Sequence, residues 1–270
     1  MRGARAPERG VRIFEDSRRL SLAVAGRFVA AAAAAVRDRG SFAVALSGGR
    51  TPRELYRVLA SEFRDFVAWP KVHFFWSDER YVPPTDRESN VRLARETLLD
   101  SLGLPPENVH PPRTDLPEPD EAAAVYEREI AAFFEPGPPR FEWIFLGLGN
   151  DGHVASLFPG SKALEERRQL VIATEDAPYP PPVRLTMTFP LIHRAREIHF
   201  LVTGEDKREA VANALAPDGA DSPARRVRPA EGRVTFWLDR AAAGEVIKTI
   251  DSGREKPRRR GGPGARGAAN

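Results

Sequence analysis

The residues best suited to chemistry follow an apolar run that ends in glycines. The stretch FEWIFLGLGNDGHVASLFPG, residues 141–160, places Asn150, Asp151, Gly152 and His153 between two apolar segments. A histidine can accept or donate a proton near neutral pH, and neighbouring glycines leave room for a ligand beside it. Asp151 could orient the imidazole or the substrate. His153 is therefore the candidate acid or base; the alternative is a helix-capping Asn-Asp turn with an incidental histidine.

A second polar segment, SGGRT, follows the apolar run SFAVAL. Its glycines, Gly48 and Gly49, would let the backbone approach a ligand closely, and Ser47 and Thr51 add hydroxyl groups. If a helix begins there, its free N–H groups and positive dipole end would attract a phosphate or carboxylate. The segment matches neither the P-loop nor the dinucleotide-binding pattern. A tight strand-to-helix turn without a ligand is an equally good interpretation.

Charged residues supply further candidates. Asp78, Glu79 and Arg80 follow the apolar run VHFFW, where they either form a functional cluster or neutralise one another at the surface. Arg184, which comes soon after three consecutive prolines, and Lys207 are two more cations that could meet an anionic substrate. Taken alone, each of these two is more typical of an ordinary surface charge.

Several classes of chemistry find little support in the sequence. The absence of cysteine excludes disulfides, thiolate nucleophiles and cysteine metal sites. The five histidines are scattered without the spacing of a metal site, so we expect no metal and no cofactor. Ser156 lies in HVASLF and not in the G-x-S-x-G sequence of a serine nucleophile.

Strands and helices are predicted in alternation along the chain. The predicted strands span residues 41–46, 72–76, 141–148, 198–203 and 234–238, with a short strand or extended turn at 184–188. The predicted helices span residues 20–37, 52–59, 89–99, 121–134 and 205–215, and a short one follows Asp239. This alternation favours an α/β fold with a mostly parallel sheet covered by helices on both faces. Because ligands bind beyond the carboxyl ends of such strands, the three polar segments should meet at one edge.

The helix after the SGGRT segment has the clearest start signal. Thr51 is a good N-cap, Pro52 suits the first helical position, and Glu54 would complete a capping box. Together they predict a helix that begins at Pro52 and ends near Leu59.

Composition sets the expected boundaries of the domain. Residues 251–270 hold six basic and two acidic side chains, so the net charge of +3 comes from this tail and the remainder is close to neutral. No basic stripe indicates nucleic-acid binding, and no apolar run reads as long enough to span a membrane. The alanine-rich run at 30–35 fits a surface helix better than a signal peptide. We expect a flexible N-terminus at 1–10, one domain at 11–250, a basic disordered tail at 251–270 and a cytoplasmic location.

Five segments, in this order, resemble the 6-phosphogluconolactonase family: LSGGRTP, WSDERYVPPTDRESN, LGLGNDGHVASLFPG, PPPVRLTMT and VTGEDKREAV. The resemblance covers most of the body of the chain, from SFAVALSGGRTPRELY to FWLDRAAA. It implies a Rossmann-like single α/β domain and the hydrolysis of 6-phospho-D-glucono-1,5-lactone to 6-phospho-D-gluconate in the oxidative pentose phosphate pathway. The broader superfamily includes glucosamine-6-phosphate deaminases and sugar-sensing regulatory domains.

The resemblance also implies roles for single residues. His153 would act as a general base toward water and return the proton to the ring oxygen, with no metal or covalent nucleophile. Asp151 would orient His153, and Asp78 would bind sugar hydroxyls or orient a partner. The phosphate would be held by the glycine segment and nearby cations, namely Ser47, Gly48, Gly49, Thr51, Arg80, Arg184 and Lys207.

Two positions separate this chain from its relatives. The deaminases carry a glutamate five positions after the DGH histidine, whereas Phe158 stands here and the ASLFPG continuation of the lactonases is intact. Family members often have a lysine in a KPPP-like stretch, whereas APYPPP here puts Tyr179 at that position. This departure places more weight on Arg184 and Lys207 as cations.

Two other functions stay open. One is an aldose–ketose isomerase or deaminase of the same superfamily, which Phe158 argues against. The other is a non-catalytic phosphosugar sensor, although roughly ten residues before the first strand-like segment are too few for a helix-turn-helix. We expect a monomer or weak homodimer whose partner is a small phosphosugar lactone, with neither nucleic acid nor membrane.

Overall fold

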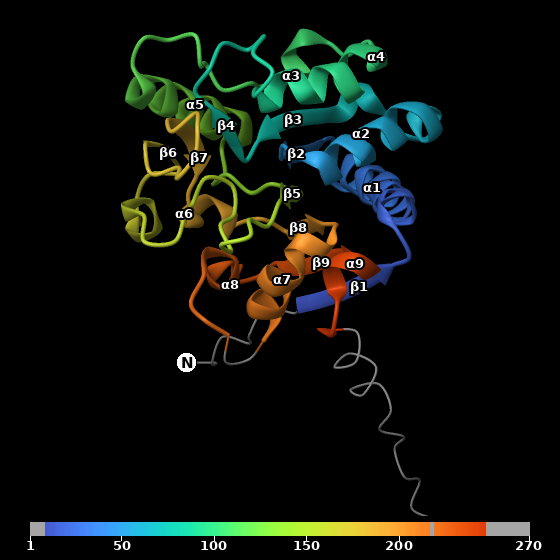
Figure 1. The fold of residues 1–270 in the computed structure, drawn as a ribbon. Coiled ribbons are helices and arrows are strands. Elements are labelled where there is room, and N and C mark those ends of the chain that lie inside the picture. The colour runs from blue at the N-terminus through green and yellow to red at the C-terminus, as the bar shows by residue number, and fades with distance from the viewer. Residues whose placement is uncertain (1–8, 217–218, 247–270) are drawn as a thin grey trace, which may run out of the picture.

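The computed structural model describes residues 9–216 and 219–246 (Figure 1). Its centre is a six-stranded sheet with strand order β1-β9-β8-β5-β2-β3, in which every neighbouring pair is parallel. The six strands are β1 (Arg9–Phe14), β2 (Phe42–Leu46), β3 (Val72–Trp76), β5 (Trp143–Leu146), β8 (Glu197–Val202) and β9 (Arg233–Asp239). The predicted α/β fold with a mostly parallel sheet is confirmed.

Helices cover both faces of this sheet because the strand side chains alternate between two apolar clusters. Phe42, Val44 and Leu46 of β2 pack with α1 and α2, whereas Ala43 and Ala45 pack on the opposite face with α5 and α7. The helices are α1 (Ser17–Arg39), α2 (Arg50–Glu62), α3 (Asn90–Ala94), α4 (Asp100–Leu102), α5 (Pro119–Phe134), α6 (Phe189–Ile192), α7 (Arg208–Leu215), α8 (Pro223–Arg226) and α9 (Arg240–Ala243), with a π-helical turn at Arg95–Leu99 between α3 and α4.

A second, three-stranded antiparallel sheet lies beside the first and was not predicted as a sheet. It has the order β4-β7-β6 and consists of β4 (Asp78–Arg80), β7 (Arg184–Met187) and β6 (Val171–Thr174). Ser77 joins the two sheets, because its N–H donates to the Leu46 carbonyl and its own carbonyl accepts from the Met187 N–H, each at 2.8 Å. Asp78 is thereby fixed at the carboxyl end of β3.

Helix α1 has the length and apolar composition of a membrane span, contrary to the expectation from the sequence. It has 23 residues, and the mean hydropathy of its most apolar window is 1.5. In this fold 39% of that window is buried. Leu20, Val24 and Phe28 of α1 lie in the apolar cluster between the helix and the sheet.

Most predicted elements are present with shifted ends, and β3 has the predicted bounds. Asp239 caps α9 as expected, because its carboxylate accepts from the Ala242 N–H at 2.7 Å. Strand β1 begins at Arg9, so the last two residues of the segment expected to be flexible, 1–10, belong to the sheet. The predicted basic tail at 251–270 lies outside the described residues.

Candidate active site

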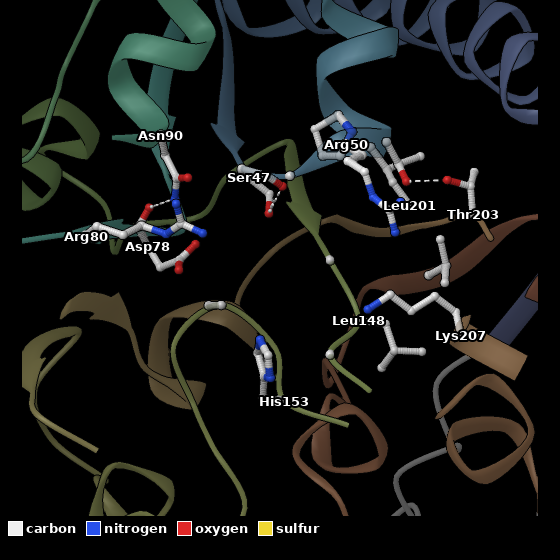
Figure 2. A pocket seen from close by; sticks show the side chains of 18 of the residues that line it. Ser47, Arg50, Asp78, Arg80, Asn90, Leu148, His153, Leu201, Thr203 and Lys207 are labelled. Carbon is white, nitrogen blue, oxygen red and sulfur yellow. Dashed lines mark hydrogen bonds between the residues drawn. The ribbon is translucent and has the colours of Figure 1, made fainter. Parts of the chain in front are cut away.

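The three polar segments surround one cavity of about 330 Å³ at the carboxyl edge of the parallel sheet (Figure 2). The loop after β2 contributes Ser47 to Thr51, and the segment after β3 contributes Asp78 and Arg80. The loop after β5 contributes His153, and Lys207 follows the end of β8. The parallel topology alone brings these distant parts of the chain together.

His153 is oriented by its neighbour in the same loop. Its Nδ1 lies 2.6 Å from Oδ1 of Asp151, which also accepts from the His153 backbone N–H at 3.0 Å. A carboxylate at Nδ1 requires the proton on that nitrogen, so we assign the lone pair to Nε2. The ring of Phe158 packs against the imidazole with its centroid 4.5 Å away. The exposed fraction of the His153 side chain is 20%, which suits a group that meets both a ligand and water.

The Asp151 carboxylate is held in its charged form by this contact. Burial on its own would raise the Asp151 pKa, but the side-chain and backbone hydrogen bonds from His153 outweigh it, and the pKa lies below its usual value. An ionised Asp151 stabilises the imidazolium that forms when His153 accepts a proton. The pair can therefore serve as an oriented general base.

The glycines of this loop have a steric reason. A Cβ at Gly149 would lie 2.0 Å from Nδ1 of His153 and 2.5 Å from Oδ1 of Asp151, so only glycine leaves space for the pair. Gly152 has a φ of +83°, in the left-handed region that favours glycine. No helix begins at this turn, and residues 149–153 close on themselves. The alternative of a helix-capping turn is therefore wrong.

The loop after β2 presents backbone, and it too needs its glycines. A Cβ at Gly48 would lie 1.9 Å from Oδ1 of Asn90, a buried residue at the start of α3. Gly49 has a φ of +104° and is the N-cap of α2. The first N–H groups of an α-helix have no intrahelical partner. The start of α2 therefore offers N–H groups and a positive dipole end to an anion in the cavity.

The predicted start of this helix is wrong by two residues. Helix α2 begins at Arg50 and has no side-chain cap. Thr51 does not act as an N-cap, because its hydroxyl pairs with that of Thr203 at 2.7 Å. Glu54 does not complete a capping box, because it accepts from the Ser17 hydroxyl at 2.7 Å. A glycine with a positive φ starts the helix instead, and the Thr51–Thr203 contact ties the loop to the end of β8.

Ser47 is fixed through its backbone. Tyr56, which is fully buried in α2, donates its hydroxyl to the Ser47 carbonyl at 2.7 Å. The Tyr56 hydroxyl oxygen in turn accepts from the Ser47 N–H at 3.1 Å. The Ser47 hydroxyl makes only a long contact of 3.4 Å to the Gly48 carbonyl, so it can turn toward a ligand.

The charged trio after β3 divides into different roles. The carboxylate of Asp78 accepts from the Ser156 hydroxyl at 2.8 Å and borders the cavity. Glu79 points away into the protein, where it accepts from the backbone N–H groups of Asn90 at 2.8 Å and Val91 at 2.7 Å. Burial raises the pKa of Glu79 to about 7, although these hydrogen bonds oppose that shift. Arg80 borders the cavity and contacts Glu88. The alternative of a self-neutralising surface trio does not describe this arrangement.

The candidate cations fall into two groups. Lys207 borders the cavity, donates to Oδ1 of Asn150 at 2.6 Å, and has its pKa lowered mainly by burial. Arg184 is not among the cavity-lining residues; it is buried in β7 and its Nε donates to the Pro181 carbonyl at 2.7 Å. Burial, and next the charge of Arg80, lower the pKa of Arg184. Of the two cations given more weight from the sequence, only Lys207 reaches the cavity.

Sequence reasoning missed four polar residues at the cavity. They are Arg50, Asn90, Tyr179 as a contact of His153, and Thr203. Thr203 is the last residue of the predicted strand 198–203, and Arg50 lies four residues beyond the predicted strand 41–46, which was a usable signal. Asn90 and Tyr179 reach the site through long loops, for which spacing gives no guide. Arg50 and Lys207 both line the cavity (Figure 2).

A metal centre has no evident location in the described part of the chain. No three histidine, aspartate or glutamate side chains there are grouped so as to hold an ion. That the protein needs no metal or cofactor stays a prediction.

Sequence comparison identifies the family. The sequence model of the family described as glucosamine-6-phosphate isomerases/6-phosphogluconolactonase matches residues 15–237. The chain belongs to this family. A protein named 6-phosphogluconolactonase from Mycobacterium tuberculosis is 42% identical over 247 residues, which cover 87% of this chain and 98% of the relative. Its namesake from Synechocystis is 44% identical over 219 residues, or 79% of this chain and 88% of the relative.

Solved structures agree with this membership of the family. The structure of 6-phosphogluconolactonase from Trypanosoma brucei is 31% identical with a TM-score of 0.78 and covers 88% of this chain and 98% of its own. A monomeric glucosamine-6-phosphate deaminase, 22% identical, has a TM-score of 0.69 over 87% of this chain and 98% of its own, which shows that it shares the fold. Because both enzymes have this fold, the residues of the cavity must distinguish them.

Proposed function

We propose that this protein hydrolyses 6-phospho-D-glucono-1,5-lactone to 6-phospho-D-gluconate in the oxidative pentose phosphate pathway. The relatives that are 42–44% identical carry the name of this activity. The observation that carries the proposal is local: an oriented Asp151–His153 pair shares one cavity with the glycine loop at the start of α2. A base at one end and an anion site at the other suit a substrate with an ester at one end and a phosphate at the other.

Phe158 favours a lactonase over a deaminase. Its ring is buried and packs against the imidazole at 4.5 Å, where the deaminase pattern would place a glutamate. An apolar ring cannot take part in proton transfer, whereas ring opening and deamination of an amino sugar require several proton transfers. Hydrolysis of an activated cyclic ester needs only one base and one water.

In this proposal, the chemical step uses the lone pair on Nε2 of His153. Nε2 takes a proton from a water whose oxygen forms a bond to C1 of the lactone, and the carbonyl oxygen becomes negative. Collapse of this intermediate breaks the bond between C1 and the ring oxygen, and the imidazolium returns its proton to that oxygen. Asp151 stays ionised and holds Nδ1 throughout. Loop N–H groups or a lining cation such as Arg80 stabilise the negative oxygen.

The phosphate is assigned to the opposite end of the cavity. The N–H groups at Gly48, Gly49 and the start of α2 point to an anion, and Arg50 and Lys207 border the same space. Ser47 and Thr51 remain candidates for hydroxyl contacts. Arg184 lies behind Tyr179 and has no direct contact with the substrate in this proposal. Binding of the distal phosphate fixes C1 relative to His153, which lowers the entropic part of the barrier.

The substrate is tested with the full chain and freshly generated 6-phosphogluconolactone, coupled to 6-phosphogluconate dehydrogenase and corrected for spontaneous opening. We expect catalysed hydrolysis, and a kcat/KM for unphosphorylated glucono-1,5-lactone lower by at least about a hundredfold because the phosphate contacts are lost. Ammonia release from glucosamine-6-phosphate is measured in parallel. Absence of catalysed opening in the folded protein, or release of ammonia, would contradict the proposal.

A further inference from the structure

Tyr179 contacts the proton-accepting nitrogen of His153. Its hydroxyl oxygen lies 3.2 Å from Nε2, and Asp151 occupies the other ring nitrogen. Burial, and next the Asp151 carboxylate, raise the pKa of the Tyr179 hydroxyl, so the hydroxyl keeps its proton at neutral pH. With the lone pair on Nε2, Tyr179 is the donor and His153 the acceptor.

The tyrosine ring is seated by two further contacts. Phe158 meets it edge-on with the centroids 5.9 Å apart, and the guanidinium carbon of Arg184 lies 5.9 Å from its centroid. Arg184 is itself held by the Pro181 carbonyl, which gives this buried cation a role away from the cavity. Tyr179 as a whole residue is nevertheless 45% exposed, so solvent lies on its open side and the side chain can turn outward.

This contact conflicts with the chemical step. The attacking water must donate to the same lone pair on Nε2, and a separation of 3.2 Å leaves no space for a water between the two groups. We propose that Tyr179 is a further active-site residue that caps Nε2 of His153 in the free enzyme and gives way when substrate and its attacking water enter. The inference rests on the proposed function, in which His153 is the base. The proton stays on Tyr179, and no covalent bond changes.

Tyr179→Phe is the informative variant because it keeps the ring and its contacts with Phe158 and Arg184 and removes only the hydroxyl. Tyr81→Phe is a matched control. The Tyr81 hydroxyl donates to the Leu116 carbonyl at 2.6 Å and does not line the cavity. Both variants lose one hydroxyl that donates one hydrogen bond, so a difference between them reports the position of Tyr179.

Access to Nε2 can be measured without any substrate. Diethyl pyrocarbonate acylates a neutral imidazole at its lone-pair nitrogen, and the tryptic peptide 141–162 contains His153 as its only histidine. Mass spectrometry of this peptide gives the rate of modification at His153. We expect a rate about fivefold higher in Tyr179→Phe than in wild type, which corresponds to a hydrogen bond of about 1 kcal/mol, and no change in Tyr81→Phe.

Kinetics give the second measurement. If the hydroxyl only caps the base, the kcat/KM of Tyr179→Phe equals that of wild type or exceeds it by up to about fivefold. Equal modification rates at His153 in wild type and Tyr179→Phe would overturn the inference. So would a fall in kcat/KM beyond about tenfold, since the hydroxyl would then stabilise the transition state. A wild type without lactonase activity would contradict the proposed function, whereas the modification rates would still decide whether Tyr179 covers Nε2.

Discussion

The two glycine loops at the carboxyl edge of the sheet have similar sequences and different structures. The loop after β2 passes directly into α2, so it presents backbone N–H groups. The loop after β5 closes on itself, with the Gly149 N–H donating to the His153 carbonyl and the Gly152 N–H to the Gly149 carbonyl, each at 3.0 Å. It therefore presents one side chain. In the proposed function, the same residue type at the same edge serves binding in one loop and proton transfer in the other.

The glycines also differ in what crowds them. At Gly149 the space belongs to His153 and Asp151, two to four residues along the same loop. At Gly48 it belongs to Asn90, more than forty residues away in the sequence. The loop after β2, which contains Gly48, therefore depends on tertiary packing. The loop after β5, which contains Gly149, depends on local geometry. Substitution of each glycine should consequently damage a different step.

Of the two glycine substitutions, Gly149→Ala should have the larger effect on turnover. The added methyl would meet Nδ1 of His153 at 2.0 Å and must displace the ring from Asp151. We expect kcat to fall by at least about a hundredfold, the usual contribution of a general base. Affinity for 6-phosphogluconate, measured by calorimetry, should change little because α2 is untouched. A large loss of affinity with normal kcat would reverse the roles assigned to the loops.

Gly48→Ala should act mainly on binding. The methyl would meet Oδ1 of Asn90 at 1.9 Å, and Asn90 cannot easily move because its side chain donates to the Asp78 carbonyl at 3.0 Å. We expect KM to rise by about tenfold, with a smaller change in kcat, because distorted N–H groups hold the phosphate less well.

A second substitution sharpens this result. Asn90→Ala removes the crowding atom, so the double variant should recover part of the affinity that Gly48→Ala loses. A coupling energy of about 1 kcal/mol or more in the double-mutant cycle is expected for groups in contact. Strict additivity would show that the damage has another origin.

Glu79 holds the start of α3 beside Gly48 through hydrogen bonds from the Asn90 and Val91 N–H groups. Its titration should have the smallest effect on activity but a measurable effect on stability. Burial raises the pKa of Glu79 to about 7 from its usual value of 4.5, so the folded protein binds this proton more tightly than the unfolded chain does. The contribution of this bound proton to the free energy of unfolding is fully present below pH 4.5 and is lost as the pH rises through about 7. The free energy of unfolding should fall by up to about 3 kcal/mol over that interval.

Urea unfolding of wild type and Glu79→Gln at several pH values between 5 and 8 checks this sign. The variant is expected to be less stable overall. The carboxylate of Glu79 accepts hydrogen bonds from backbone N–H groups, whereas the NH₂ group of glutamine is a donor and would face these donors without forming a hydrogen bond. Its free energy of unfolding should nevertheless depend less on pH. Parallel pH dependences of the two proteins would show that Glu79 does not titrate in this range.

The sequence predicted the elements that carry His153 and the glycine segments because these follow long apolar strands. It did not predict the start of α2. Thr51, Pro52 and Glu54 form a good local capping pattern, but Thr203 and Ser17 offer Thr51 and Glu54 partners from distant parts of the chain. Tertiary contacts therefore overrode a local signal.

The small antiparallel sheet and the position of Arg184 could not be predicted from the sequence for a related reason. Strands β4 and β6 have three and four residues, too few to show a periodic pattern. Arg184 looked like a ligand for phosphate because it follows a proline run, yet β7 buries it beneath Tyr179. Only the pairing of β4 with β7 in three dimensions shows that Arg80 borders the cavity and that Arg184 does not.

The most direct measurement is the turnover of His153→Ala on 6-phosphogluconolactone, together with its affinity for 6-phosphogluconate. His193→Gln is the control, because His193 lies outside the cavity and contacts the Arg226 carbonyl. Our account predicts that kcat falls by about 10²- to 10⁴-fold in His153→Ala while product affinity stays within a few-fold of wild type. Full turnover in His153→Ala would contradict it and place the base elsewhere, with Asp78 as the next candidate on the same cavity.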